Sequence, residues 1–249
     1  EDLGGKLELN AEVASIELSG GLARTVVTWD GRRFVTDAVA SNADVVNTYK
    51  QLLGHEQRGR DEAKRLSGKR FSMSLFVIHF GLKRRHEHLQ HHTVCFGPRY
   101  RELIDEIFKR ETLADDFSLY LHAPCVTDPS PVPHLGTADI DWAVEGPKYR
   151  DRIFEYLERH YIPGLREDLV THRIFTPFDF RDELNAHLGS AFSLEPILTQ
   201  SAWFRTHNRD DVILNLYIVG AGTHPGAGVP GVVGSAKATA GLMLEDLSG

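Results

Sequence analysis

Cysteine and methionine are scarce in this chain of 249 residues, which contains two of each. The cysteines, Cys95 and Cys125, are too few for a disulfide framework and lack the spacing of metal ligands, so we expect a reducing compartment. No apolar run approaches the roughly 20 residues that a membrane-spanning helix needs. Basic residues do not dominate either, because 28 Lys and Arg face 35 Asp and Glu, a net charge of −7. General nucleic-acid binding requires a basic face, so this balance argues against that class of protein.

The composition is that of a globular protein, with 41% hydrophobic and 25% charged residues. Segments that alternate apolar and polar residues, or are apolar on both faces, predict strands at 6–10, 13–18, 25–29, 34–40, 71–82, 93–96, 117–122, 170–175 and 215–219. Helices are predicted from a cap at Ser41 or Asn42 to about residue 53, and at 99–110, 146–161, 177–188 and 232–247. Four prolines predict a loop at 124–133. These alternating elements, with at least one sheet containing antiparallel pairs, indicate the α/β class with α+β elements.

A glycine-rich loop stands near the end of the chain. Five glycines occur between residues 220 and 231, after a short apolar strand and before a helix of small residues. Glycine lets a backbone approach a cofactor closely, and a helix N-terminus offers N–H donors and partial positive charge. Gly226–Gly231 matches the dinucleotide pattern G-x-G-x-x-G, but the 18 residues that follow leave no room for the required second strand. The loop therefore either completes a site whose phosphate-binding half lies elsewhere, or is a tight turn that packs the last helix.

The residues from Asn215 to Val229, followed by Ser235, resemble the C-terminal signature of the bacterial-type phytoene desaturases. These are FAD-dependent carotenoid desaturases among the amine-oxidase-like flavoproteins. Six further segments stand in the order of that family, at 4–13, 40–44, 96–100, 122–124, 163–165 and 175–177. The family begins with a strand, a G-x-G-x-x-G turn and an acidic ribose ligand, which do not occur here. The resemblance thus implies the C-terminal half of such an enzyme, with the N-terminal half as its partner.

The resemblance also implies a two-domain fold and a set of cofactor contacts. Residues 1–45 would belong to the FAD-binding domain, residues 46–200 would form a substrate-binding domain around a mixed sheet, and residues 201–249 would return to the FAD-binding domain. The implied FAD contacts are Val13 at the adenine, Gly220, Ala221, Gly222 and Thr223 along the ribityl and pyrophosphate side, and Gly228, Val229, Pro230 and Gly231 at the flavin ring.

The activity that the resemblance implies is the FAD-dependent desaturation of phytoene, a long apolar polyene, toward lycopene. Because this substrate is insoluble in water, we expect a cytoplasmic protein that is peripherally associated with the inner membrane. Glu195 and His207 flank the segment before the last strand, but the sequence identifies no catalytic residue. An alternative from another class is a non-catalytic carotenoid- or lipid-binding module derived from the same fold.

Four histidines lie within seven residues, at His86, His88, His91 and His92. Metal sites usually combine defined ligand spacing with carboxylates behind the ligands, and Glu87 is the one carboxylate close by. A solvated polar loop is therefore the favoured interpretation over a metal centre, and no metal is expected.

Overall fold

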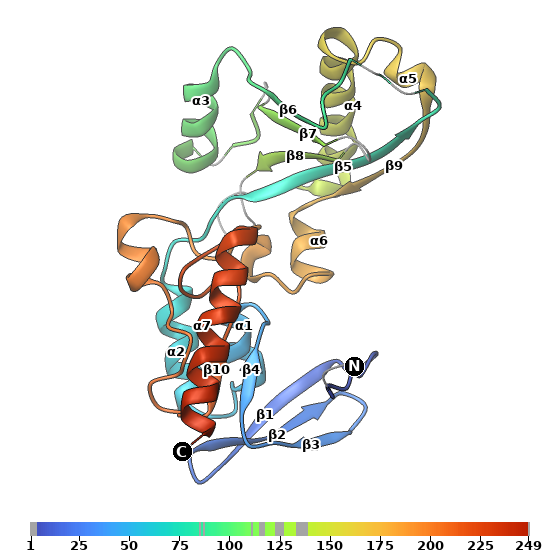
Figure 1. Ribbon diagram of the computed structural model, residues 1–249. Helices are drawn as coiled ribbons and strands as arrows, with labels where there is room; N and C mark the ends of the chain where they lie inside the picture. The colour runs from blue at the N-terminus through green and yellow to red at the C-terminus, as the bar shows by residue number, and fades with distance from the viewer. Residues whose placement is uncertain are drawn as a thin grey trace. The chain divides into compact units, whose positions relative to one another are not determined.

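The computed structural model in Figure 1 describes residues 4–84, 86, 88–110, 112–114, 118–122, 127–132 and 139–248, with the backbone alone at 127–132. The chain divides into two compact units. The first unit is Glu1–Arg70 with Ser193–Gly249, and the second unit is Phe71–Phe192. The family resemblance implied that residues 46–200 form a substrate-binding domain. By packing, two parts of this range, residues 46–70 and 193–200, belong to the first unit instead. The function of each part stays a prediction.

The first unit contains two small sheets. Strands β1 (Val13–Ser19), β2 (Leu22–Thr28) and β3 (Arg33–Val35) form an antiparallel sheet, which confirms the strands predicted at 13–18 and 25–29. Strand β4 (Val39–Ser41) pairs in parallel with β10 (Leu216–Ile218), so segments far apart in the sequence lie side by side. The strand predicted at 6–10 does not form, and Asn10 there has a positive φ of 54°, which interrupts an extended chain.

The helices of the first unit are α1 (Val45–Asn47), α2 (Gln57–Ser67) and α7 (Val229–Leu247), and α1 continues as a π-helical turn at Thr48–Leu52. The predicted cap of the first helix was wrong. Asp44 is the N-cap, and its Oδ1 accepts hydrogen bonds from the backbone N–H of Val46 (2.9 Å) and Asn47 (3.1 Å). Ser41 cannot serve as the cap because it belongs to β4.

The second unit is built on a five-stranded sheet in the order β6-β7-β8-β5-β9 (Figure 1). Its strands are β5 (Ser74–Leu82), β6 (His92–Cys95), β7 (Leu119–His122), β8 (Thr127–Val132) and β9 (Leu169–Phe175). Its helices are α3 (Tyr100–Asp105), α4 (Trp142–His160), α5 (Leu165–Asp168) and α6 (Pro177–Asp182). Helix α4 covers one face of the sheet, and apolar side chains from both, such as Phe76, Ile78, Ile153 and Leu157, form the buried core.

Three details of this unit differ from the prediction. The sheet was expected to be mixed, but its described strand pairs are all antiparallel. Residues 127–132 of the predicted proline-rich loop form strand β8. Proline has no backbone N–H group to donate to a neighbouring strand. It is tolerated in β8 because β8 pairs with β7 at only one residue pair, so few backbone N–H groups of β8 are needed for pairing with β7. Helix α6 ends at Asp182 rather than near residue 188, because Asn185 and Leu188 adopt positive φ angles of 52° and 57°.

Within the described residues, no helix has both the length and the apolar character needed to cross a membrane.

Candidate functional site

The glycine loop joins strand β10 to helix α7 in the first unit. The chain turns at Gly220, whose φ of 113° is disfavoured for residues with a Cβ atom. A Cβ atom at Gly220 would lie 2.5 Å from Oδ1 of Asn42, and one at Gly222 would lie 2.7 Å from Cγ1 of Val45. Only glycine therefore lets the loop approach the connection between β4 and α1 this closely.

The second half of the loop is open where helix α7 begins. Gly228 is the N-cap with a φ of 89°, and a Cβ atom there would meet no other atom within 4 Å. No side chain caps the first turn, and Val229 and Pro230 are exposed. The N–H donors and partial positive charge of a 19-residue helix thus face accessible space.

Buried hydroxyl groups fasten this helix to the loop and to β10. Oγ of Ser235 accepts a hydrogen bond from the N–H of Gly220 (3.1 Å) and lies 2.8 Å from Oγ1 of Thr223. The side-chain amide of Asn208 donates to Ser235 (3.0 Å) and to Oγ1 of Thr239 (3.1 Å). Ser235 and Thr239 are the buried residues of α7, so the helix packs through a polar face.

The hydrogen bond between the hydroxyls of Ser235 and Thr223 has a definite direction, because each hydroxyl has only one hydrogen to donate. Thr223 donates its one hydroxyl hydrogen to the carbonyl oxygen of Gly220 (3.0 Å). Ser235 must therefore donate its own hydroxyl hydrogen to Thr223. Each hydroxyl in the cluster then acts as both donor and acceptor, which is how a buried polar group avoids an uncompensated desolvation cost.

A buried guanidinium group supports the loop from the other side. Nε and Nη2 of Arg205 donate to the carbonyl oxygen of Ala221 at 2.9 and 2.6 Å. The same group donates to the carbonyls of Gln200 (3.3 Å) and Leu194 (3.1 Å). Burial lowers the pKa of Arg205, and these carbonyl dipoles offset part of the cost of holding a cation there. The carbonyl of Ala221 is thereby fixed in orientation.

A second charged anchor holds the segment that leads into β10. The carboxylate of Asp210 accepts hydrogen bonds from the hydroxyl of Tyr49 (2.7 Å) and from Nη2 of Arg58 (2.9 Å), and from the backbone N–H groups of Val212 (2.8 Å) and Ile213 (2.7 Å). Burial alone would raise the pKa of Asp210, but the hydrogen bonds, chiefly from Arg58 and then Ile213, hold it below its usual range. Asp210 is therefore an ionised structural anchor.

The structure brings together most of the residues that the sequence predicted for the cofactor. Residues 220–223 and 228–231 lie at the two ends of one loop beside α7, whereas Val13 begins β1 in the other sheet of this unit. Of the two residues that flank the segment before the last strand, Glu195 pairs with Nε of Arg70 (2.7 Å) and the ring of His207 packs against Trp203.

Asn208 and Arg205 are structural residues of the site that sequence reasoning did not identify. No local pattern distinguishes either of them. A signal did exist for their partner helix, because Ser235 and Thr239 stand four residues apart in an otherwise small and apolar helix, which places both hydroxyls on one face.

Comparison with known proteins identifies the family to which the chain belongs. Residues 1–244 match the family model described as flavin containing amine oxidoreductase. A phytoene desaturase (lycopene-forming) of Pantoea ananas is 66% identical over 99% of this chain and 53% of its own length. A phytoene desaturase (neurosporene-forming) of Rhodobacter capsulatus is 44% identical over 98% of this chain and 50% of its own length.

A solved structure shares the fold. An oxidoreductase from Methanosarcina mazei superposes with a TM-score of 0.55 at 16% identity, over 96% of this chain and 50% of that one. The chain spans about half the length of the curated relatives it matches.

The buried hydroxyl cluster predicts a specific loss of stability. Replacing Ser235 with alanine leaves the N–H of Gly220 buried without its acceptor, so we expect Ser235→Ala to lower the free energy of unfolding by about 1–3 kcal/mol. Urea unfolding measures the change. Ser248→Ala, at the exposed end of the same helix, is the control and should stay within about 0.5 kcal/mol of the unaltered chain. Equal losses in the two variants would contradict the prediction.

The glycine loop predicts opposite effects for two glycine-to-alanine substitutions. Gly220→Ala forces a positive φ and a clash with Asn42, so its urea midpoint should fall, by an amount equivalent to about 1–3 kcal/mol. Gly241→Ala lies inside α7 with no atom within 4 Å of the added methyl group, so it should raise stability by about 0.5–1 kcal/mol. A Gly220→Ala chain as stable as the unaltered one would show that the tight turn is not required.

Proposed function

Because this chain belongs to the family of flavin-containing amine oxidoreductases, we propose that it is the C-terminal part of an FAD-dependent phytoene desaturase. The observation that carries the proposal is the 62–66% identity, over nearly the whole chain, with relatives named as lycopene-forming phytoene desaturases. The complete enzyme would introduce double bonds into phytoene toward lycopene. The relatives reported above are named as enzymes, which favours this function over a non-catalytic binding module.

The residues of the glycine loop fit the cofactor that this family implies, FAD. Gly220, Ala221, Gly222 and Thr223 bring the backbone close to where the ribityl and pyrophosphate groups would lie, and the open start of α7 at residues 228–231 would face the flavin ring. The N–H groups there would stabilise negative charge near the flavin C2 carbonyl. Val13 would contact the adenine. When bound, FAD supplies the hydride acceptor for removing hydrogen from adjacent saturated carbons.

The outer face of α7 supports the N-terminal half of the same enzyme as the partner. Val229, Val233, Leu244 and Leu247 are exposed by 77, 63, 69 and 54% and recur on one side of the helix with the exposed Ala236 and Ala240. A continuous apolar helix face of this kind is normally covered. A chain that spans half of its relatives' length leaves a protein segment of comparable size to cover it.

Exposed apolar residues around α3 in the second unit support a peripheral position at a membrane, in a cytoplasmic protein at the inner membrane. Phe96, Tyr100 and Ile104 are exposed by 64, 47 and 37%, and the rings of Phe96 and Tyr100 contact each other edge to face. Arg101 of α3 and Lys109, four residues after the end of α3, are exposed, and Lys109 pairs with Asp105 (2.7 Å). Apolar side chains flanked by cations are the combination that binds an anionic lipid surface, from which a water-insoluble substrate would be taken.

The desaturase proposal predicts a division of labour between two halves. The chain joined to its N-terminal half should carry bound FAD, seen as flavin absorption, and should convert phytoene in lipid vesicles to more conjugated products. The chain alone should do neither, because the phosphate-binding part of the site would be missing. Flavin spectra and chromatographic analysis of the carotenes check both statements.

Two results would contradict this prediction in different ways. Tight FAD binding by the 249-residue chain alone would contradict the division of labour. A joined protein that binds FAD and phytoene but leaves phytoene unchanged would contradict the activity and favour the non-catalytic module.

The membrane proposal predicts that the apolar residues at α3 contribute to vesicle binding. A Phe96→Ser, Ile104→Asn double variant should bind anionic phosphatidylglycerol vesicles about tenfold more weakly or worse, because burying one large apolar side chain contributes about 1.5–3 kcal/mol. Co-sedimentation measures the partition. Leu184→Ser removes a different exposed apolar side chain of the second unit and should bind as the unaltered protein does. Equal loss in both variants would show that the α3 surface has no special part in binding.

A further inference from the structure

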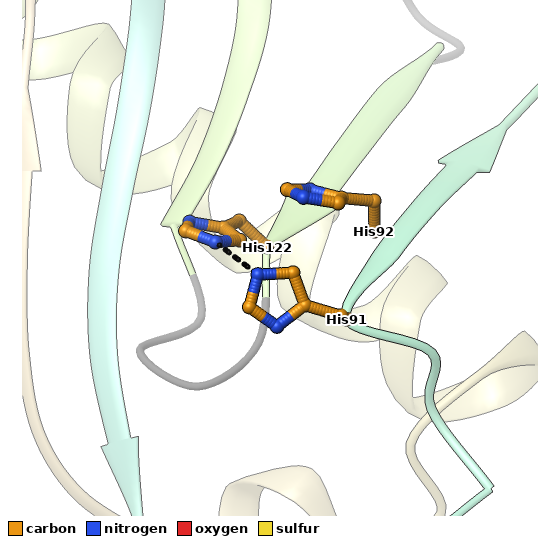
Figure 2. Close-up of side chains that lie close together, drawn as sticks. All are labelled: His91, His92 and His122. Atoms are coloured by element: carbon orange, nitrogen blue, oxygen red, sulfur yellow. Dashed lines mark hydrogen bonds between the residues drawn. The ribbon is translucent and has the colours of Figure 1, made fainter.

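Three histidines meet at one edge of the sheet in the second unit. Strands β6 and β7 pair antiparallel with His92 directly opposite His122, and His91 immediately precedes β6. Figure 2 shows the three imidazole rings close together, with His91 and His122 joined by a hydrogen bond and the ring of His92 stacked on that of His122. His91 and His92 are exposed and His122 is half-buried, so the cluster is accessible from solvent.

The ring nitrogens of His91 and His122 are spaced nearly as two ligands of one metal ion are, and a nitrogen of His92 lies close by. Nε2 of His91 and Nε2 of His122 lie 3.1 Å apart. In a tetrahedral zinc site with Zn–N bonds of about 2.0–2.1 Å, neighbouring ligand nitrogens are separated by about 3.3 Å. One nitrogen from each of the three histidines lies within 4.8 Å of the others, so the third ligand needs to approach by no more than about 1.5 Å, the difference between 4.8 Å and that separation.

We propose that His91, His92 and His122 form a binding site for one divalent transition-metal ion of the zinc class. Imidazole nitrogen is a preferred ligand of such ions, and three protein ligands leave the fourth position of a tetrahedral site for water. The proposal does not depend on the desaturase function, because these residues lie in the second unit and the proposed flavin contacts lie in the first.

His92 is the ligand that has to adjust. Its ring is stacked on that of His122 with 4.8 Å between the centroids and an angle of 7° between the planes, so their in-plane lone pairs run parallel. A modest turn of the exposed His92 ring brings its nitrogen toward the other two. The hydroxyl of Tyr120 is hydrogen-bonded to Nδ1 of His92, which leaves Nε2 to act as the ligand.

The trio differs from the cluster of four histidines at residues 86–92 that the sequence shows. His86 lies 3.7 Å from a carboxylate oxygen of Asp168 and His88 is bonded to the carbonyl of Tyr161, so neither belongs to the trio.

The test is a titration of the full chain, without an affinity tag and freed of metal, with Co²⁺ followed by Zn²⁺. We expect saturable binding of one Co²⁺ per chain with the intense visible absorption of tetrahedral coordination, and displacement by Zn²⁺. His91→Ala and His122→Ala should each weaken binding by at least about 100-fold, because loss of a residue that merely supports a ligand already costs 10–100-fold. His88→Ala, an exposed histidine of the same region outside the trio, is the matched control and should leave the affinity within a factor of about three.

Each other outcome would overturn the proposal. These outcomes are uptake without saturation, a weak octahedral Co²⁺ spectrum, and a loss in His88→Ala equal to that in His91→Ala. His91 is exposed and precedes the strand, so circular dichroism of His91→Ala should match that of the unaltered chain, and its loss of metal can be read without a loss of fold.

Discussion

Hydrogen bonds of hydroxyl groups and one amide hold helix α7 at the end of strand β10. Ser235 and Thr239 face inward and meet Asn208 and Thr223, while apolar residues of the same helix face outward. Apolar packing is not directional, whereas a hydrogen bond has a definite length and angle. The cluster therefore holds the glycine loop at one distance from the helix, and Arg205 holds the carbonyl of Ala221 in one orientation.

The glycines of the loop and the exposed face of α7 have separate physical causes. Residues 220 and 222 have no space for a Cβ atom because Asn42 and Val45 lie against them. With its polar side turned inward, α7 keeps an apolar stripe for another surface, which includes Val233 and Leu244. Both features suit a chain that belongs to a flavin family and spans half the length of its relatives. The first unit thus combines a tightly fixed loop with an exposed apolar helix face.

The second unit is organised differently. Its core is the ordinary packing of a sheet against α4, with Phe76 in contact with Trp142 and Tyr149. Antiparallel pairing brings the end of β7 beside the start of β6, and this places His122 against His91 and His92. Three imidazoles at an exposed strand end contribute little to the packing of this core. They are therefore available for binding without a loss of stability.

The sequence alone predicted the elements whose signals are local. The strands β1, β2 and β5, the helices α4 and α7 and the glycine loop each follow from periodicity or turn residues within a short segment, and the family resemblance rests on motifs of the same kind. Local signals failed where a neighbour distant in sequence decided the outcome. Pro129 and Pro131 read as a loop, yet pairing with β5 makes their segment a strand.

Only the tertiary structure decided which side chains meet. Asn208 joins Ser235 across 27 residues, and His122 joins His91 across 31. Hydrogen bonding and metal ligation depend on separations of about 3 Å in space. The position of a residue along the chain does not determine such a separation until strands have paired and helices have packed.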